Sequence, residues 1–216
     1  MNSQINRLRV GVLGGTFDPL HIGHLIAAER VFDELKLDEI WFLPSHIPPH
    51  KLDHPPTPAA HRVEMVRRAI APYPEFHLCL VELEREGPSY TVDTMEQLRK
   101  EYPSYRFYFI MGADMVDYLP HWHRYEDLLA KVPIVALKRP GFTLPKHVTW
   151  ADQITFVPMP QLDLSSSEIR RMRREGKSIR FLVPDVVEHY IEEKGLYVEQ
   201  RGVTPEDERA GKGETV

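Results

Sequence analysis

Residues 8–24 have the sequence LRVGVLGGTFDPLHIGH, and this stretch indicates the fold of the whole chain. Leu8–Leu13 is a short apolar run with alternating valines, which predicts a strand. Two glycines follow, and from Ile22 to Leu37 the apolar residues recur at the period of a helix. A strand, a tight glycine turn and a helix are the opening unit of a parallel sheet covered by helices.

The same alternation of apolar runs and helix-period segments continues along the chain. Strands are predicted at Glu39–Leu43, Phe76–Leu83, Tyr105–Met111, Pro133–Leu137 and Ile154–Pro158, and helices at Ala59–Ala71, Val92–Tyr102 and Tyr125–Lys131. Runs such as IWFL and FYFI are hydrophobic almost throughout, as in strands that are covered on both faces. The sequence therefore predicts an α/β fold, a Rossmann-like open parallel sheet with helices on both faces.

The C-terminal part of the chain is predicted to be helical. Two helices are expected, each ended by a glycine suited to a left-handed cap: Ser165–Glu175 with Gly176, and Pro184–Lys194 with Gly195. They form a small helical extension, at about residues 165–195, of a single domain that spans residues 1–198. Residues 199–216 have little apolar content and no periodicity, so they are predicted to be a disordered tail.

Composition limits the classes of function. A chain of 216 residues that is 42% hydrophobic can bury one substantial core. Its 27 basic and 32 acidic side chains give a formal charge of −5, which attracts no polyanion, so no nucleic-acid partner is expected. The apolar runs are shorter than the roughly 20 residues that cross a bilayer, and the polar start MNSQINRLR lacks a secretion signal. We therefore expect a cytoplasmic protein with no membrane partner, whose single cysteine, Cys79, is a buried core thiol.

The glycine turn has the properties of a phosphate site. It follows the first strand, and ligands of open parallel sheets bind at the carboxyl ends of strands. Gly14 and Gly15 allow close approach of the backbone to an oxygen-rich ligand, and the next helix presents its positive end to phosphate. His21 and His24 are three residues apart at the start of that helix, which places both imidazoles on one side. Two such donors can stabilise charge that develops on a triphosphate.

Two plainer interpretations of this turn remain open. The glycines can make a tight turn in which the histidines only cap or pack, and the two histidines can contribute to a zinc site. The first would be favoured for an isolated Gly-Gly pair, but here the glycines, both histidines and Asp18 cluster within eleven residues at a predicted ligand edge. The second has too few ligands without distant residues, so no metal ligand is assigned.

The segment GGTFDPLHIGH resembles the motif of the nucleotidylyltransferase superfamily, whose two HxGH histidines match His21 and His24. The resemblance implies that both histidines are catalytic. His24 would contact the ATP phosphates and support the transition state, assisted by His21 and Thr16, and Asp18 would help to position the acceptor and the loop. The ATP-binding residues implied in this segment are Gly14, Gly15, Thr16, Phe17, His21 and His24.

A second anion site is predicted in the stretch LSSSEIR at residues 164–170. Hydroxyls and free N–H groups at a helix start bind anions, and Arg170 adds a planar charge that matches phosphate oxygens. Simple helix capping by Ser165 is an equally good interpretation of this stretch alone. It also resembles the SSTxxR motif of the same superfamily, with Ser167 in place of threonine, and the resemblance implies ATP contacts by Ser165, Ser166, Ser167, Ile169 and Arg170. Both phosphate-binding segments are then expected to converge on one triphosphate.

The middle of the chain bears on the acceptor. Four segments of the chain resemble the bacterial nicotinate-nucleotide adenylyltransferase family, a resemblance that extends across most of residues 8–195. They are PPHK ending at Lys51, SYTVDT around Thr91, GAD at 112–114 followed by LxxW, and RPG at 139–141. The resemblance implies adenosine contacts by Gly112 and Asp114. It assigns the acceptor to Asp18, Lys51, Thr91, Trp122 and Arg139. A packed aromatic for Trp122 and a solvated charge for Lys51 are the plainer alternatives.

The resemblance implies transfer of AMP from ATP to nicotinate mononucleotide, giving deamido-NAD and pyrophosphate in NAD biosynthesis, with Mg²⁺ held mainly by the ATP phosphates. Nicotinamide mononucleotide or pantetheine phosphate as acceptor, and a sensor that binds ATP without turnover, are the alternatives. The tetrapeptide HIGH also occurs in aminoacyl-tRNA synthetases, but the chain lacks a KMSKS-like loop. A homo-oligomer is left open.

Overall fold

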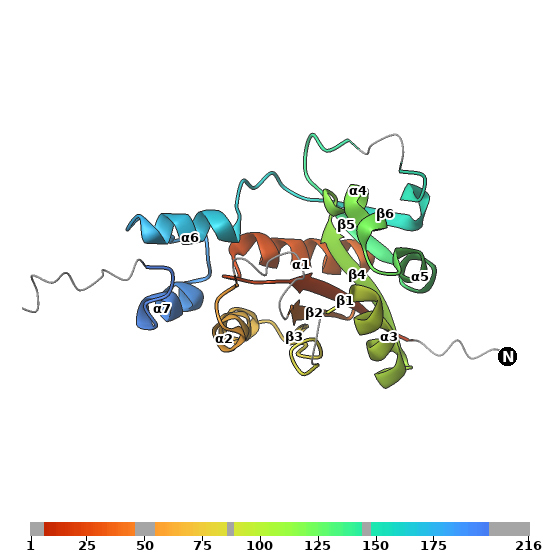
Figure 1. Ribbon diagram of the computed structural model, residues 1–216, viewed down its shortest axis with the longest axis horizontal. Helices are drawn as coiled ribbons and strands as arrows, with labels where there is room; N and C mark the ends of the chain where they lie inside the picture. Colours follow the sequence, from red (N-terminus) through yellow and green to blue (C-terminus); the bar gives the residue numbers. More distant parts are fainter. Residues whose placement is uncertain (1–6, 46–54, 86–88, 144–147, 199–216) are drawn as a thin grey trace, which may run out of the picture.

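Six parallel strands form the centre of the computed structural model, which describes residues 7–45, 55–85, 89–143 and 148–198 (Figure 1). The strands are β1 (Leu8–Gly15), β2 (Glu39–Pro44), β3 (Phe76–Leu78), β4 (Tyr105–Gly112), β5 (Ile134–Lys138) and β6 (Ile154–Pro158). Their order is β3-β2-β1-β4-β5-β6, and every pairing is parallel. The strand order reverses between β1 and β4, which is where open α/β sheets bind ligands. The predicted α/β fold is confirmed.

Helices cover both faces of this sheet. They are α1 (Ile22–Leu35), α2 (Ala59–Ile70), α3 (Thr91–Glu101), α4 (Met115–Tyr118), α5 (Tyr125–Lys131), α6 (Ser166–Arg174) and α7 (Asp185–Glu193), with 3-10 turns η2 (Leu119–His121) and η3 (Ala151–Gln153). Helices α1, α2, α6 and α7 share one core with the sheet, and α3, α4 and α5 share the other. Figure 1 shows α6 and α7 beyond the carboxyl ends of the strands.

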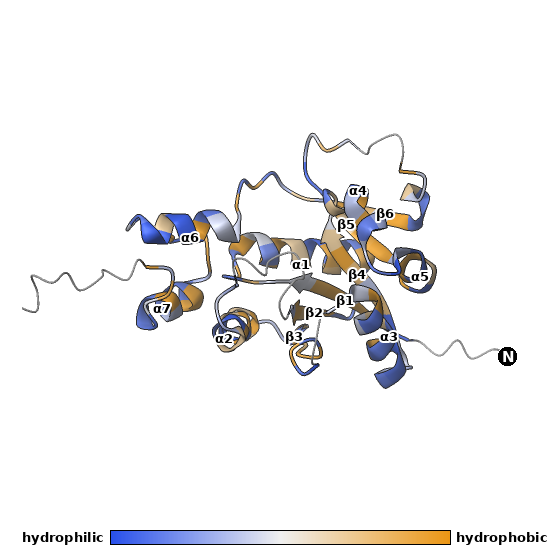
Figure 2. Ribbon diagram, viewed as in Figure 1, coloured by the Kyte–Doolittle hydropathy of each residue, from blue (hydrophilic) through white to orange (hydrophobic). Residues whose placement is uncertain are grey.

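The two cores follow from the alternation of side chains along each strand. In β1, Val10 and Val12 point into the core with α3 and α5, whereas Leu13 points into the core with α1 and α2. All three are buried, because both faces of a central parallel strand are covered. Figure 2 shows the same pattern as orange strands between helices whose outer sides are blue.

Two of the predicted boundaries that differ from the structure have a clear physical cause. The strand expected at Phe76–Leu83 is only the three-residue β3, because it is an edge strand that pairs with β2 over Ile40–Phe42, and Leu80 then accepts a turn hydrogen bond from the Leu83 N–H. Helix α1 ends at Leu35 and not at Leu37, because Lys36 takes a left-handed conformation with φ 48°. Both apolar runs continue past the end of the regular element because the residues that follow are also buried.

The predicted glycine caps and the buried cysteine are confirmed. Gly176 and Gly195 both have positive φ, 70° and 59°, after α6 and α7. Cys79 is buried, and burial raises the pKa of its thiol. Within the described ranges, no helix combines the length and the apolar character that a bilayer crossing requires.

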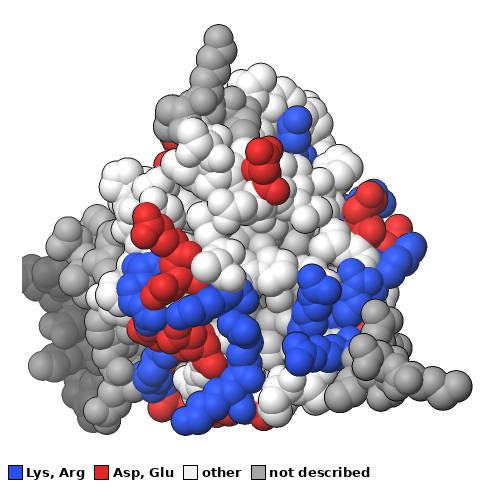
Figure 3. All heavy atoms as spheres, turned by 90° about the vertical axis from the view of Figure 1, so that its right-hand side faces the viewer, with Lys and Arg blue, Asp and Glu red and all other residues white. Residues whose placement is uncertain are grey.

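Charged side chains of both signs are interleaved on the end of the molecule that Figure 3 shows. An ion-pair network ties α3 to α5, in which Arg124 lies 2.9 Å from Glu96 and 3.1 Å from Asp93, and Lys131 lies 2.7 Å from Glu96. These groups are all more than one-third exposed, so each pair adds little to the free energy of folding.

The glycine inside β1 gives a test of this packing. A Cβ added to Gly11 would lie 2.7 Å from Ile40 Cδ1, 2.8 Å from Leu37 Cδ1 and 2.9 Å from Ile110 Cδ1. Three buried side chains would have to move, so we expect Gly11→Ala to lower the free energy of unfolding by about 1–3 kcal/mol in denaturant titrations. Gly14→Ala is the control on the same strand, because its Cβ would meet only the Phe109 ring at 3.4 Å. An equal loss in both variants would contradict the packing argument.

Candidate active site

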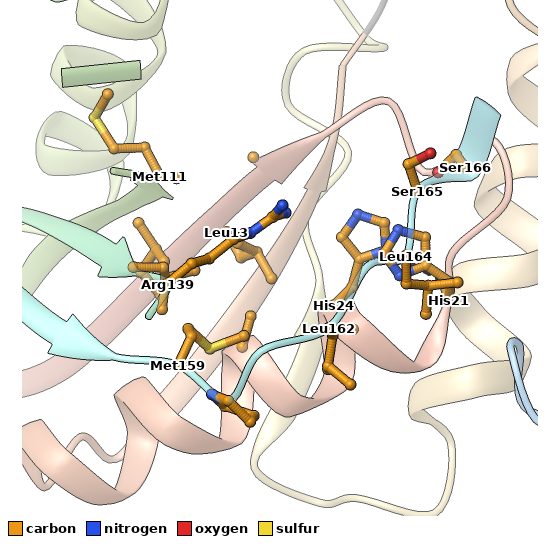
Figure 4. Close-up of a pocket in the computed structure, with 17 residues that line it drawn as sticks. Leu13, His21, His24, Met111, Arg139, Met159, Leu162, Leu164, Ser165 and Ser166 are labelled. Atoms are coloured by element: carbon orange, nitrogen blue, oxygen red, sulfur yellow. Dashed lines mark hydrogen bonds between the residues drawn. The ribbon is translucent and has the colours of Figure 1, made fainter. Parts of the chain in front are cut away.

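A cavity of about 360 Å³ opens at the carboxyl edge of the sheet, between β1, β4, β5, the start of α1 and the start of α6 (Figure 4). Its volume lies in the range of about 300–1,000 Å³ that is usual for small-molecule sites. Seven of the residues predicted from sequence line it, namely Gly14, His21, His24, Gly112, Arg139, Ser165 and Ser166. The glycine loop and the serine-rich start of α6 therefore meet at one cavity.

Hydrogen bonds hold these two segments together. The Ser166 hydroxyl donates to the Pro19 carbonyl at 2.9 Å, across 147 residues of sequence. Arg170 Nη1 donates to the Asp18 carbonyl at 2.6 Å. Ile169, between them on α6, is fully buried in the core and does not line the cavity. The start of α6 is thus held against the glycine loop by hydrogen bonds within the protein.

The two histidine rings lie face to face, with centroids 3.7 Å apart and an interplanar angle of 23°. The backbone N–H of His21 donates to His24 Nδ1 at 3.1 Å. Because Nδ1 is an acceptor, the proton of a neutral His24 ring lies on Nε2, which is free to donate. His21 is only 7% exposed, and its Nδ1 has no hydrogen-bond partner in the described part of the chain.

This arrangement does not favour the zinc alternative. The rings are stacked and one Nδ1 is engaged by the backbone, so they do not converge on a common point. In the described residues, no group of three or more His, Cys, Asp or Glu side chains could hold a metal ion.

Both histidines are neutral at neutral pH. Burial lowers the pKa of His21 from 6.5 to about 4, and the positive charge of Arg139 contributes to this. Burial also lowers the pKa of His24, with a further contribution from His21. The rings can therefore donate hydrogen bonds to a triphosphate, but the positive charge has to come from elsewhere.

Arg139 is positioned to supply that charge. It follows β5 directly, and Figure 4 shows its side chain extending toward the two histidine rings. The sequence resemblance assigns Arg139 to the acceptor, whereas the structure places it in the same cavity as the residues assigned to ATP. The N-terminus of α6, with Ser165 and Ser166 at the cavity wall, is a second source of positive potential.

Phe17 supports the histidines from the core side. Its ring is 1% exposed and meets the His24 ring edge-on, with centroids 5.0 Å apart. The backbone at Phe17 is left-handed, with φ 50°, and a Cβ at Gly15 would lie 2.9 Å from the Phe17 ring. Gly15 is therefore required by close packing beneath the loop, and Phe17 orients His24 without lining the cavity.

Serine residues at the start of α6 have more than one role. The Ser165 hydroxyl accepts from the Glu168 N–H at 3.2 Å, so Ser165 caps the helix and also lines the cavity. The Ser167 hydroxyl accepts from Arg170 Nη2 at 3.2 Å, and the same guanidinium donates to the Asp18 carbonyl. Ser165 can therefore both cap α6 and contribute to the cavity, so the two interpretations of this stretch of sequence are compatible.

Two of the residues assigned to the acceptor, Trp122 and Thr91, lie apart from this cavity. Trp122 packs edge-on against Phe109 at 6.0 Å, in the core on the other face of the sheet, and Thr91 begins α3 on that face. Asp114, assigned to adenosine, is exposed just after β4. Gly14 connects the two regions, since it lines the cavity and a Cβ there would touch Phe109.

Some predicted residues lie outside the described part of the chain. These are Lys51 with the rest of the segment 47–51, residues 87 and 88 of the loop before Thr91, and the tail at 199–216.

Sequence reasoning missed Arg62, which is 2% exposed. Its guanidinium donates to the carbonyls of Thr16 at 2.7 Å, Ser45 at 2.9 Å and Thr57 at 2.9 Å. It thereby ties the glycine loop to the end of β2. A signal was present in the sequence, because Arg62 shares a helical face with the buried Met65 and Val66, where a charge needs partners.

Asp18 is also held within the protein. Its carboxylate is buried and accepts from the Thr57 N–H at 3.1 Å and from the Tyr197 hydroxyl at 2.6 Å. This geometry suits the expected role of Asp18 in positioning the loop.

Comparisons with known proteins bear on the family and the fold of the chain. The cytidylyltransferase-like family model matches residues 12–172. The chain is 50% identical to the "Probable nicotinate-nucleotide adenylyltransferase" of Geobacillus kaustophilus, covering 94% of this chain and 92% of that protein. It is 47% identical to the nicotinate-nucleotide adenylyltransferase of Bacillus subtilis, covering 88% and 98%. The fold matches the Plasmodium falciparum nicotinic acid mononucleotide adenylyltransferase complexed with NaAD, with a TM-score of 0.72, 22% identity, and coverage of 88% and 97%.

The neutral histidines predict a pH dependence of stability. In the unfolded chain the pKa of His21 returns to about 6.5, so between pH 6.5 and 4 the unfolded state binds more protons than the folded state. The free energy of unfolding therefore falls as the pH decreases through this window. In denaturant titrations, we expect His21→Gln to make this decline shallower by up to about 1.4 kcal/mol per pH unit. The exposed His189→Gln is the control, and a wild-type slope in His21→Gln would refute the buried neutral state.

Proposed function

The chain belongs to the cytidylyltransferase-like family and, within it, to the nicotinate-nucleotide adenylyltransferases, and we propose that its cavity binds the ATP triphosphate for adenylyl transfer. The enzyme is a nucleotidyltransferase that transfers AMP from ATP to nicotinate mononucleotide, giving deamido-NAD and pyrophosphate in NAD biosynthesis. The observation that carries the site assignment is the convergence of the histidine pair, Arg139 and the start of α6 on one cavity.

The reaction is an in-line displacement at the α-phosphorus of ATP. An oxygen of the acceptor 5′-phosphate forms the new P–O bond, the bond between the α-phosphorus and the bridging oxygen breaks, and pyrophosphate leaves. The acceptor phosphate is itself the nucleophile, so the chemistry needs no covalent attack by a side chain. Catalysis then depends on positioning the two substrates and on stabilising charge that moves toward the leaving group.

The cavity residues supply complementary interactions for that charge. His24 Nε2–H donates to an oxygen of the triphosphate, and its neighbour His21 provides a second neutral ring beside it. Arg139 provides the cation. The N–H groups at the start of α6 and the Ser165 and Ser166 hydroxyls bind the phosphates from the other side.

The acceptor binds across Gly14 from this cavity. Trp122 offers an aromatic face beside Phe109 for the nicotinate ring, and Thr91 offers a hydroxyl and the first N–H of α3 for its carboxylate. Gly112 and Asp114, at the end of β4, lie between the two regions and contact adenosine. Because Gly14 has no side chain, the α-phosphate of ATP and the 5′-phosphate of the acceptor can approach each other over β1.

We also propose Mg²⁺ as the cofactor of the transfer. Mg²⁺ binds through substrate phosphates with one or two carboxylates at most, and the described residues contain no protein cage of three or more ligating side chains. We assign it to the ATP phosphates. When bound, it neutralises part of the phosphate charge.

The activity is tested by incubating the full-length protein with ATP, Mg²⁺ and one mononucleotide at a time, and measuring pyrophosphate. We expect release with nicotinate mononucleotide, and slower release with nicotinamide mononucleotide, because a carboxylate accepts from N–H and hydroxyl donors more strongly than an amide. Equal use of pantetheine phosphate would overturn the acceptor assignment. Binding of ATP without any pyrophosphate release would identify a sensor instead.

Among the side chains of the cavity, His24 is expected to contribute most to catalysis. Loss of one aligned donor to developing charge lowers kcat by about 10²–10³-fold, so we expect His24→Ala to fall by that factor in the same assay while remaining folded by circular dichroism. His189→Ala, on the exposed side of α7, is the matched control and should retain full activity. A folded His24→Ala enzyme with near-normal kcat would remove His24 from the mechanism.

A further inference from the structure

A tyrosine near the end of the helical extension reaches back to the phosphate-binding loop. The Tyr197 hydroxyl donates to Asp18 Oδ1 at 2.6 Å, across 179 residues of sequence. The backbone at Tyr197 is left-handed, with φ 61°, a conformation that residues other than glycine and asparagine rarely adopt. Such a conformation persists only where the surroundings hold it, so the placement of this side chain is specific.

The carboxylate that Tyr197 meets is a buried junction of the loop. Asp18 is 5% exposed, and its Oδ2 accepts from the Thr57 N–H at 3.1 Å. Arg170 Nη1 lies 3.9 Å from the same oxygen and donates to the Asp18 carbonyl. A buried carboxylate needs each of its donors, because an unpaired oxygen away from water is unfavourable.

Residues of the extension also form hydrogen bonds with the loop on either side of His21. Before it, the Ser166 hydroxyl donates to the Pro19 carbonyl at 2.9 Å. After it, the Ile22 N–H donates to the Leu182 carbonyl at 2.9 Å. Asp18, Pro19 and Ile22 are therefore all bonded to residues 166–197, and the position of His21 between them depends on these contacts.

Tyr197 is suited to a permanent donor role. Burial raises the pKa of its hydroxyl well above the ordinary range, and the charge of Asp18 raises it further, so the proton stays on the tyrosine. The hydroxyl oxygen also lies 4.0 Å from Met65 Sδ in α2, on the core side of the loop. The contact is internal, and Tyr197 does not line the cavity.

We propose that Tyr197 is a positioning residue for adenylyl transfer, which holds Asp18 and thereby sets the loop geometry that presents His21 and His24 to the triphosphate. This inference rests on the proposed function of the cavity. It assigns to the C-terminal extension a part in catalysis beyond its contribution to the core.

The test compares two tyrosine-to-phenylalanine variants of the same extension. Tyr197→Phe removes the bond to Asp18, and Tyr190→Phe, the control, removes a hydroxyl that lies 2.9 Å from His61 Nδ1, away from the loop. Small misplacement of catalytic groups costs up to about 10²-fold, so we expect Tyr197→Phe to lower kcat by about 10-fold to 10²-fold. The KM for ATP should change less than about twofold, because only transition-state contacts are weakened. Tyr190→Phe should keep the wild-type kcat.

A double-variant cycle separates positioning from general loosening. With rates normalised to the folded fraction measured by circular dichroism, Tyr197→Phe in an Asp18→Asn background should cost little more than Asp18→Asn alone. Additive losses, equal losses in both phenylalanine variants, or a wild-type kcat in Tyr197→Phe would each overturn the inference. Failure of the proposed function is distinguishable, because the wild-type enzyme itself would then release no pyrophosphate.

Discussion

The buried, irregular loop between β1 and α1 is the constraint on which the site depends. Outside a helix or a sheet, its carbonyls have no regular partners, and a buried carbonyl without a donor is unfavourable. Arg62 donates a hydrogen bond to the carbonyl of Thr16, Arg170 to that of Asp18, and the Ser166 hydroxyl to that of Pro19. The donors come from α2 and α6, so the loop takes its shape only when both helices have packed.

Burial of the histidines has a direct chemical consequence. A charged imidazole pair would bind phosphate tightly in the ground state, but here burial and mutual proximity keep both rings neutral at neutral pH. A neutral donor still interacts more strongly as charge accumulates on the oxygen that it faces, so neutral rings are compatible with the role in transfer that is proposed for them. The fixed charge is left to Arg139 and to the start of α6, at the cavity wall.

The sheet separates two tasks. Residues on the α1 and α6 side form the cavity assigned to the triphosphate, while Trp122 and Thr91 lie on the α3 side, where the acceptor is assigned. Gly14 is the point where the two meet, because its missing side chain leaves the edge of β1 open between the cavity and Phe109. The strand order places this residue at the centre of the sheet, next to the reversal between β1 and β4.

The sequence by itself determined the α/β class, the order of the elements and the two segments that meet at the cavity, because apolar periodicity, glycine turns and the HxGH and serine motifs are local patterns. It did not determine where β3 and α1 end, since edge pairing and a left-handed Lys36 decide those boundaries. Only the tertiary structure placed Arg139 beside the histidines, buried Arg62 under the loop and joined Tyr197 to Asp18. Those contacts join residues between 46 and 179 positions apart or arise from burial, and neither distance in space nor loss of water is encoded in a local pattern.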